Sequence, residues 1–130
     1  MSTLEVSNLN DGTTTVATTY VTNGSAKAWV NFQGDGTVAI RDSLNTSSIT
    51  DTTTGQYFQN YTSNMNAVDY CSVGSAGKSS GGHTESNSGY VNLAEISGTY
   101  VNKRTIFVCT VAGDFVDRDH VTCMIIGDLA

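Results

Sequence analysis

The clearest structural signal in the chain is residues 26–42, AKAWVNFQGDGTVAIRD. From Ala26 to Phe32, small and apolar side chains at the even positions alternate with Lys27, Trp29 and Asn31, which is the period of two expected of a β-strand. The glycines of GDG at 34–36 can supply the positive φ angles of a tight turn, and TVAIRD returns as a second strand. We therefore predict a β-hairpin at 26–42.

The rest of the chain continues in short strands separated by turns. In order, the pattern predicts a loop or edge strand at 45–55, strands at 56–62 and 67–73, an exposed Gly/Ser/Asn-rich loop at 74–88, a weak strand at 89–96, a strong strand at 99–111, a loop at 112–119 and a last strand at 120–126. No stretch has helical apolar spacing. This pattern indicates an all-β protein built as an antiparallel β-sandwich or jelly-roll-like domain.

The first 24 residues differ in composition from the rest of the chain. They hold one alternating stretch at 3–7, the turn Asn10-Asp11-Gly12 and a threonine-rich run, and they are too polar to form a core of their own. A chain of 130 residues suits one compact domain or one domain with an arm. We predict an extended N-terminal attachment arm at 1–24 and a β-sandwich domain at 25–130.

Charge and cysteine content narrow the classes of partner. The net charge of −6 comes from six basic and twelve acidic residues with no basic cluster, which argues against a nucleic-acid partner. No apolar run is long enough for membrane insertion, and the first residues lack the features of a signal peptide, so we expect a soluble chain. The spacing of Cys71, Cys109 and Cys123 fits no zinc site. We expect these cysteines to be free thiols in a protein made in a reducing cytosol. No cofactor is predicted.

The two C-terminal strands suggest an oligomer. A hairpin centred on Val116 would place Cys109 opposite Cys123 and Phe107 opposite Ile125, and both of its faces would be apolar. A pair of strands with two apolar faces needs cover on both sides, which a homo-oligomer supplies. We expect these four residues to form the interface of a homo-oligomer, with a trimer as the expected form. The alternative is a central strand pair within one sandwich.

One loop comes close to two functional motifs. Residues 77–81, GKSSG, fit G-x-S-x-G, whose serine must sit on a strained turn between a strand and a helix, but no helix is predicted after Ser79. The nearest base is His83 in the same loop. Residues 74–79, GSAGKS, lack the first glycine of a phosphate-binding loop, because Ser72 stands in its place. We predict no catalytic residue and no nucleotide site.

The loop before the last strand carries the acidic residues considered as metal ligands. Asp114, Asp117 and Asp119 have short spacing, but the glycine and the final glutamate of a calcium loop are missing, and Arg118 is a neutralising neighbour. We expect a solvated charged turn. The residues predicted to lie in exposed recognition loops are Lys78, His83, Glu85, Asp117 and Arg118.

The N-terminal half resembles a family of virion proteins. Residues 1–6, MSTLEV, are similar to the start of many small proteins of marine tailed bacteriophages. Residues 24–32 (GSAKAWVNF), 36–43 (GTVAIRDS) and 47–51 (SSITD) resemble the tail-fibre-like virion domain of these proteins, and the resemblance covers about residues 1–73, including Gly55, Tyr57, Thr62 and Met65. It implies a non-enzymatic virion component, a fibre or tip module, with trimeric assembly.

Three functions follow as hypotheses. The first is a structural component exposed on a tailed-phage virion, of tail-fibre or fibre-tip type, that serves host attachment. The second is a capsid decoration protein that stabilises the phage head, and the third is a carbohydrate-binding or carbohydrate-cleaving domain. The expected partners are copies of the chain itself, other tail or capsid proteins contacted through the arm, and a host surface glycan. The expected location is the virion, assembled in the bacterial host cytoplasm.

Overall fold

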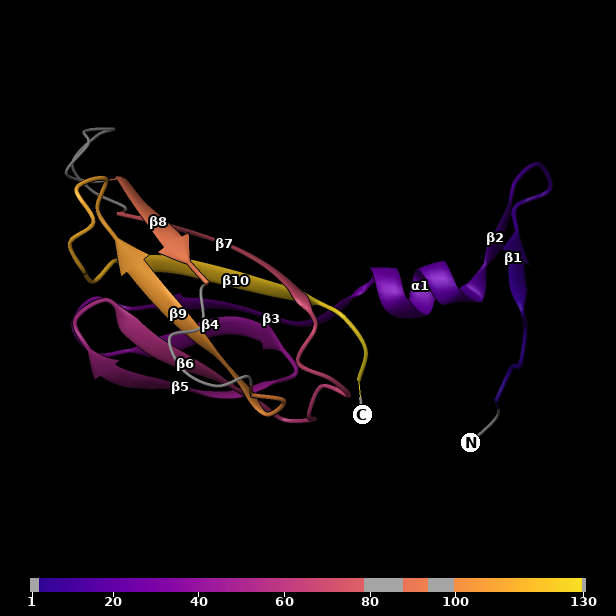
Figure 1. Cartoon of the computed structure of the whole chain (residues 1–130), viewed down its shortest axis with the longest axis horizontal. Helices are drawn as coiled ribbons and strands as arrows, with labels where there is room; N and C mark the ends of the chain where they lie inside the picture. The colour runs from indigo at the N-terminus through magenta and orange to yellow at the C-terminus, as the bar shows by residue number, and fades with distance from the viewer. Residues whose placement is uncertain (1–2, 79–87, 94–99, 130) are drawn as a thin grey trace.

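The structure is a computed structural model that describes residues 3–78, 88–93 and 100–129, and for Ser88 and Gly89 the backbone alone. Its elements are β1 (Asn8–Asn10), β2 (Thr15–Ala17), α1 (Thr18–Gly24), β3 (Ala26–Gln33), β4 (Ala39–Leu44), β5 (Thr46–Thr53), β6 (Gln56–Tyr61), β7 (Cys71–Gly77), β8 (Ser88–Asn92), β9 (Lys103–Cys109) and β10 (His120–Ile126). β1, β2 and α1 project from one end of the domain formed by the other strands (Figure 1).

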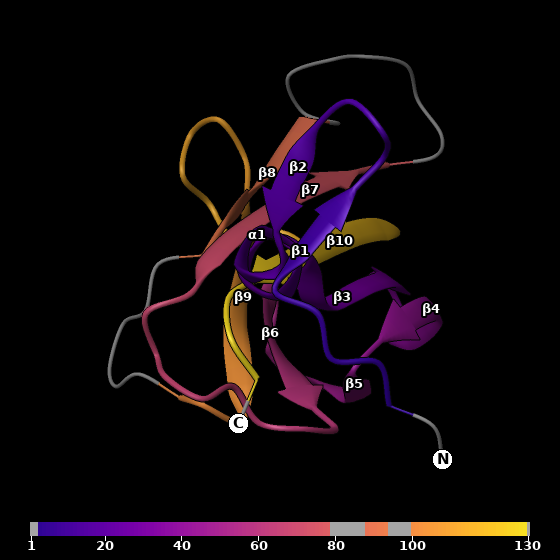
Figure 2. The same ribbon diagram turned by 90° about the vertical axis from the view of Figure 1, so that its right-hand side faces the viewer.

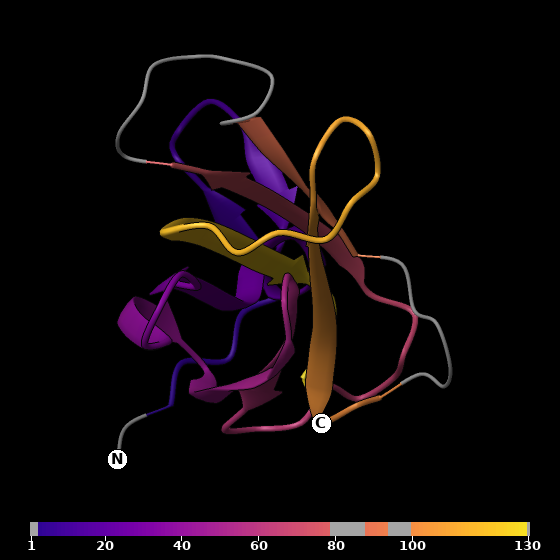
Figure 3. The same cartoon turned by 90° about the vertical axis from the view of Figure 1, so that its left-hand side faces the viewer.

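Eight antiparallel strands form the domain, in the order β4-β3-β10-β7-β8-β9-β6-β5. The two outer strands, β4 and β5, follow each other in the chain through Asn45, which has a φ of 51°. The sheet therefore curls until its halves face each other, as the two end-on views show (Figure 2, Figure 3). The predicted all-β, antiparallel, sandwich-like fold is confirmed.

The predicted hairpin at 26–42 is the β3–β4 pair. The even positions Ala28, Val30 and Phe32 point inward and are fully buried, and Gly36 in the turn has a φ of 70°. Phe32 packs edge-on against Tyr57 of β6, with ring centroids 5.1 Å apart. The core thus lies between the two layers, and the alternation of β3 fixes which of its side chains face outward.

The strands β9 and β10 do not form the predicted hairpin. β9 lies between β6 and β8, and β10 lies between β3 and β7, so Cys123 pairs with Val30 and Gly74 rather than with Cys109. β7, β8 and β9 are neighbours in the sheet in chain order, and the next strand, β10, pairs with the first of them, β7. This strand order is a Greek key. The connection turns back on itself at Gly113, where the Gly113 N–H donates to the Thr110 carbonyl. Alternation within two strands cannot distinguish such a crossover from a tight hairpin, because both need the same local pattern.

Two further expectations need correction. β7 begins at Cys71, later than predicted, and continues to Gly77 through residues expected to be loop. Its small residues have a packing reason, because a Cβ at Gly74 would lie 2.7 Å from the Thr122 carbonyl oxygen and 2.8 Å from Val91. The arm contains α1, where no helix was predicted; α1 has no side-chain cap and no buried residue.

Candidate docking face

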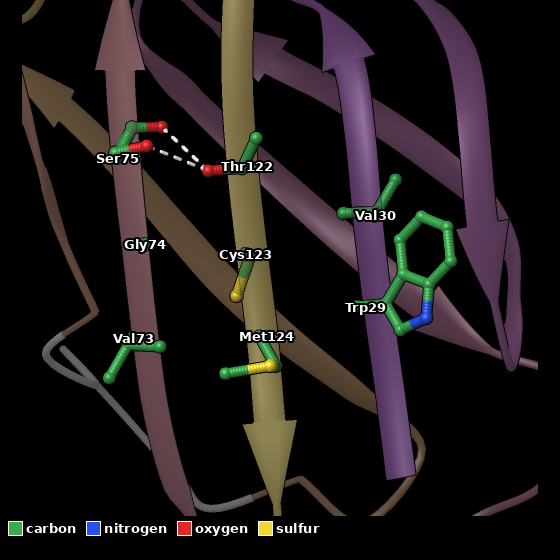
Figure 4. Close-up of a pocket in the computed structure, with 8 residues that line it drawn as sticks. All are labelled: Trp29, Val30, Val73, Gly74, Ser75, Thr122, Cys123 and Met124. Atoms are coloured by element: carbon green, nitrogen blue, oxygen red, sulfur yellow. Dashed lines mark hydrogen bonds between the residues drawn. The ribbon is translucent and has the colours of Figure 1, made fainter. Parts of the chain in front are cut away.

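The outward face of β4-β3-β10-β7 carries a continuous row of large apolar side chains. Met124 of β10 lies directly opposite Trp29 of β3 on one side and Val73 of β7 on the other, and Trp29 lies opposite Leu44 of β4. Figure 4 shows three of these side chains next to one another across β7, β10 and β3. The row exists because the inward alternation of β3 and β10 sends the odd position Trp29 and the even position Met124 outward.

This row is open to solvent. Val73 is 49% exposed, Leu44 47% and Met124 37%, and Trp29 is half-buried. A shallow depression of about 490 Å³ lies along Trp29, Met124 and Val73 and contains no charged lining residue. We call Leu44, Trp29, Met124 and Val73 the apolar row. Contiguous exposed apolar side chains of this kind mark interaction surfaces in soluble proteins.

A polar row borders the apolar row on one side. Ser75, Thr122, Asn31 and Asp42 lie opposite one another across the same four strands. The hydroxyls of Ser75 and Thr122 are 2.8 Å apart, a contact drawn in Figure 4. The face thus has an apolar band with a hydrogen-bonding rim, which is the usual anatomy of a protein interface.

The projecting arm also exposes apolar side chains. Leu9 and Val16 lie opposite each other in the β1–β2 hairpin, and together with Val21 of α1 they border a second shallow depression of about 500 Å³. All three are among the exposed large hydrophobics. The hairpin turn itself is well formed, because the Asp11 carboxylate accepts hydrogen bonds from the Thr14 and Thr13 N–H groups, which lower its pKa.

Asp117 and Arg118, predicted as exposed recognition residues, are not exposed. The Asp117 carboxylate accepts a 2.7 Å hydrogen bond from the Gly55 N–H and lies 2.7 Å from the Tyr57 hydroxyl. Arg118 is 4% exposed, and its carbonyl accepts a 2.9 Å hydrogen bond from the Gly34 N–H. Both residues fasten the β9–β10 connection to neighbouring turns. A run of charges predicts a solvated turn only when no backbone N–H lies within its reach.

The loop residues considered from the sequence, Ser79 and the possible metal ligands among them, divide into three groups. Lys78 is exposed at the end of β7, whereas Ser79, His83 and Glu85 lie outside the described residues. Asp114, Asp117 and Asp119 are not brought together, since no group of three His, Cys, Asp or Glu side chains in the described part of the chain is arranged to hold a metal ion.

The residues predicted to form an oligomer interface are buried within one chain; they are Phe107, Cys109, Cys123 and Ile125. β9 has two buried faces as expected, but the chain covers both itself, and Phe107 packs on Phe115 with ring centroids 5.7 Å apart. Burial raises the pKa of the Cys123 thiol to about 12. A surface for a second copy must therefore lie elsewhere on the molecule.

Sequence reasoning did not single out the apolar row. Trp29 was the one available signal, as a large aromatic residue at an outward position of the best-defined strand.

Within the described ranges, no helix is long and apolar enough to cross a membrane. In comparisons with known proteins, no family model, no curated protein and no solved structure matches this chain.

Proposed function

We propose that this protein is a non-enzymatic structural component displayed on the surface of a tailed-phage particle, as a tail-fibre or fibre-tip module for host attachment. The observation that carries an assembly role is the pair of uncovered apolar surfaces, one on the outward sheet face and one on the projecting arm. The phage assignment rests on the sequence resemblance over residues 1–73.

Three properties of the chain support a role as a particle component. The arm stands clear of the domain, so it can reach a neighbouring protein (Figure 1). The acidic net charge of −6 suits a particle exterior better than a surface facing packaged DNA. The three cysteines are free, which fits assembly in a reducing cytosol. Residues 1–24 then act as the element that joins the domain to its assembly.

The test is the position of the protein on purified particles. A copy labelled at its C-terminus should be seen at the tail tip or along the fibres by electron microscopy. A label on the head would assign the protein to capsid decoration instead, and a label absent from purified particles would refute a virion role. A chain lacking residues 1–24 should fold as the β-domain and fail to join the particle.

The non-enzymatic part of the proposal has its own test at Ser79. A fluorophosphonate probe should not label this serine in the native protein, and Ser79→Ala should change stability by no more than about 0.5 kcal/mol. Stoichiometric labelling that disappears with His83→Gln would make the protein a hydrolase.

A further inference from the structure

We infer that the arm of one copy docks through Leu9, Val16 and Val21 onto the apolar row of a second copy. This inference deepens the proposed assembly role, on which it rests, by naming the partner of both uncovered surfaces as the chain itself. It concerns purified protein and needs no other particle component.

The arm requires a partner to be stable in the form described. α1 has seven residues, no side-chain cap and no buried residue, and isolated helices shorter than about 12–15 residues are marginal in water. Among the described strands, β1 and β2 pair only with each other, and a lone two-stranded hairpin is likewise marginal. An apolar surface that covers Leu9, Val16 and Val21 would supply the missing burial for all three elements.

Charge favours these two surfaces as the place where copies meet. Each chain carries a net charge of −6, so copies repel each other wherever acidic side chains approach. The depression along the apolar row has no charged lining residue. The depression on the arm has one, Asp11, whose carboxylate is held by the N–H groups of Thr13 and Thr14. The two depressions therefore bring a single carboxylate, that of Asp11, into the contact, and Asp42 lies outside it in the polar row.

The course of the chain favours exchange between copies over folding back. The arm joins β3 at Ala26, three residues and about 10 Å from Trp29. Ser25, between α1 and β3, is extended, with φ −83° and ψ 152°. Its N–H donates to the Val21 carbonyl at 3.3 Å, and the arm continues outward from the sheet (Figure 1). Reaching its own apolar row would require a reversal at Ser25. The apolar row of a neighbouring copy placed beside the start of β3 can be reached without a reversal of the chain. If each copy docks its arm on the row of the next copy, the contacts close a symmetric oligomer.

The first test is the oligomeric state of the full chain by light scattering. Wild-type protein should be oligomeric at micromolar concentration, and Met124→Asp on the row and Val21→Asp on the arm should each raise the apparent dissociation constant at least about thirtyfold, as expected of central interface residues. Val111→Asp, which alters an exposed apolar residue of the β9–β10 connection, is the matched control and should have no effect. Leu44→Ser on the edge strand β4 is the second row variant and should also raise the apparent dissociation constant.

A cross-linking experiment identifies which surfaces touch. Cys71 is exposed at the start of β7, two residues from Val73, and Cys109 and Cys123 are buried. A tagged Leu9→Cys/Cys71→Ser chain mixed with untagged wild-type chain should give, with a short bismaleimide, a tagged product of twice the chain mass. The same product should be absent when Thr50→Cys on the opposite layer replaces Leu9→Cys.

Three results would overturn the inference. The first is a monomeric wild-type protein. The second is loss of the oligomer in Met124→Asp but not in Val21→Asp, which would indicate that two rows pack face to face. The third is absence of this mixed product together with a cross-link within a Leu9→Cys chain that keeps Cys71, which would mean that the arm folds back. None of these results bears on whether the protein is found on phage particles, so the proposed virion role succeeds or fails separately.

Discussion

Two buried tyrosine hydroxyls make the stability of this protein sensitive to alkaline pH. Tyr57 is fully buried and Tyr61 nearly so. Burial is the largest cause that raises the pKa of both phenols far above the ordinary value, and at Tyr57 the neighbouring Asp117 carboxylate raises it further. The native state therefore keeps both protons at pH values where the unfolded chain releases them.

The sign and size of the effect follow from proton linkage. Above about pH 10 the native state binds more protons than the unfolded state, so the free energy of unfolding falls as pH rises. For each tyrosine the fall is about 1 kcal/mol between pH 10 and 11, and it approaches about 1.4 kcal/mol per pH unit at higher pH. Burial also raises the pKa of the Cys123 thiol to about 12, which adds a similar slope from about pH 9 upward. Together these three groups predict a loss of about 3 kcal/mol between pH 10 and 11, because the unfolded tyrosines are only half ionised at pH 10.

The perturbation that isolates one group is Tyr57→Phe. It should reduce the slope between pH 10 and 11 by about 1 kcal/mol per pH unit. At pH 7 it should cost about 1.5–3 kcal/mol, because the lost hydroxyl lies 2.7 Å from both the Gly34 carbonyl and the Asp117 carboxylate.

The assay is urea unfolding followed by far-ultraviolet circular dichroism, at constant protein concentration and at pH values from 7 to 11. Tyr20→Phe, which changes an exposed side chain of the arm, is the control and should leave the slope unchanged. A Tyr57→Phe variant with the wild-type slope between pH 10 and 11 would show that the native state does not protect this hydroxyl, and the reasoning would fail.

Three further predictions concern packing, the β9–β10 connection and the thiols. Gly74→Val should destabilise the fold by about 1–3 kcal/mol through overpacking, measured by urea unfolding. Gly77→Ala, where no atom of the described residues lies within 4 Å of the added Cβ, should change the stability by less than about 0.5 kcal/mol. Asp117→Ala should cost about 2–3 kcal/mol because it removes the carboxylate that accepts from the Gly55 N–H and one of the two acceptors beside the Tyr57 hydroxyl. Asp114→Ala on the exposed turn should stay within about 0.5 kcal/mol, and equal effects would contradict the assigned role of Asp117. A thiol reagent at low protein concentration should modify Cys71 alone in the native protein and all three cysteines in denaturant, and fast native reaction of Cys123 would contradict its burial.

Local patterns in the sequence were sufficient for the strands that alternate clearly. The prediction for 120–126 matches β10, where Val121, Cys123 and Ile125 point inward, and 56–62 matches β6 to within one residue. Such strands can be predicted from their own side chains, because one face is buried and the other is exposed, so apolar and polar residues alternate. β7 lacks this signal, since Gly74 and its neighbours are small for reasons set by Val91 and Thr122 across the sheet.

The arm shows the limit of composition as a guide. A polar segment without a core of its own was predicted for residues 1–24, and the hairpin turn at Asn10-Asp11-Gly12 follows directly from its residues. The helix α1 did not follow, because its sequence TTYVTNG is rich in β-branched residues and ends in Asn-Gly, all poor helix formers. A helix so weak in propensity takes its stability from what it packs against.

The apolar row could not be predicted from the sequence because strand register creates it. Leu44, Trp29, Met124 and Val73 come from four strands, and each alone is an ordinary apolar residue at the surface. A slip of one residue in β10 would turn Met124 inward and expose Cys123 and Ile125, so the burial of those two residues is what holds Met124 on the outside. The same inward alternation that stabilises the core therefore aligns the outward row. A sheet that ends in an edge strand such as β4 would normally avoid an uncharged apolar band beside that edge, because the band invites association. Its presence here, beside the root of an arm with its own unburied apolar side chains, is the physical reason for assigning this face to assembly.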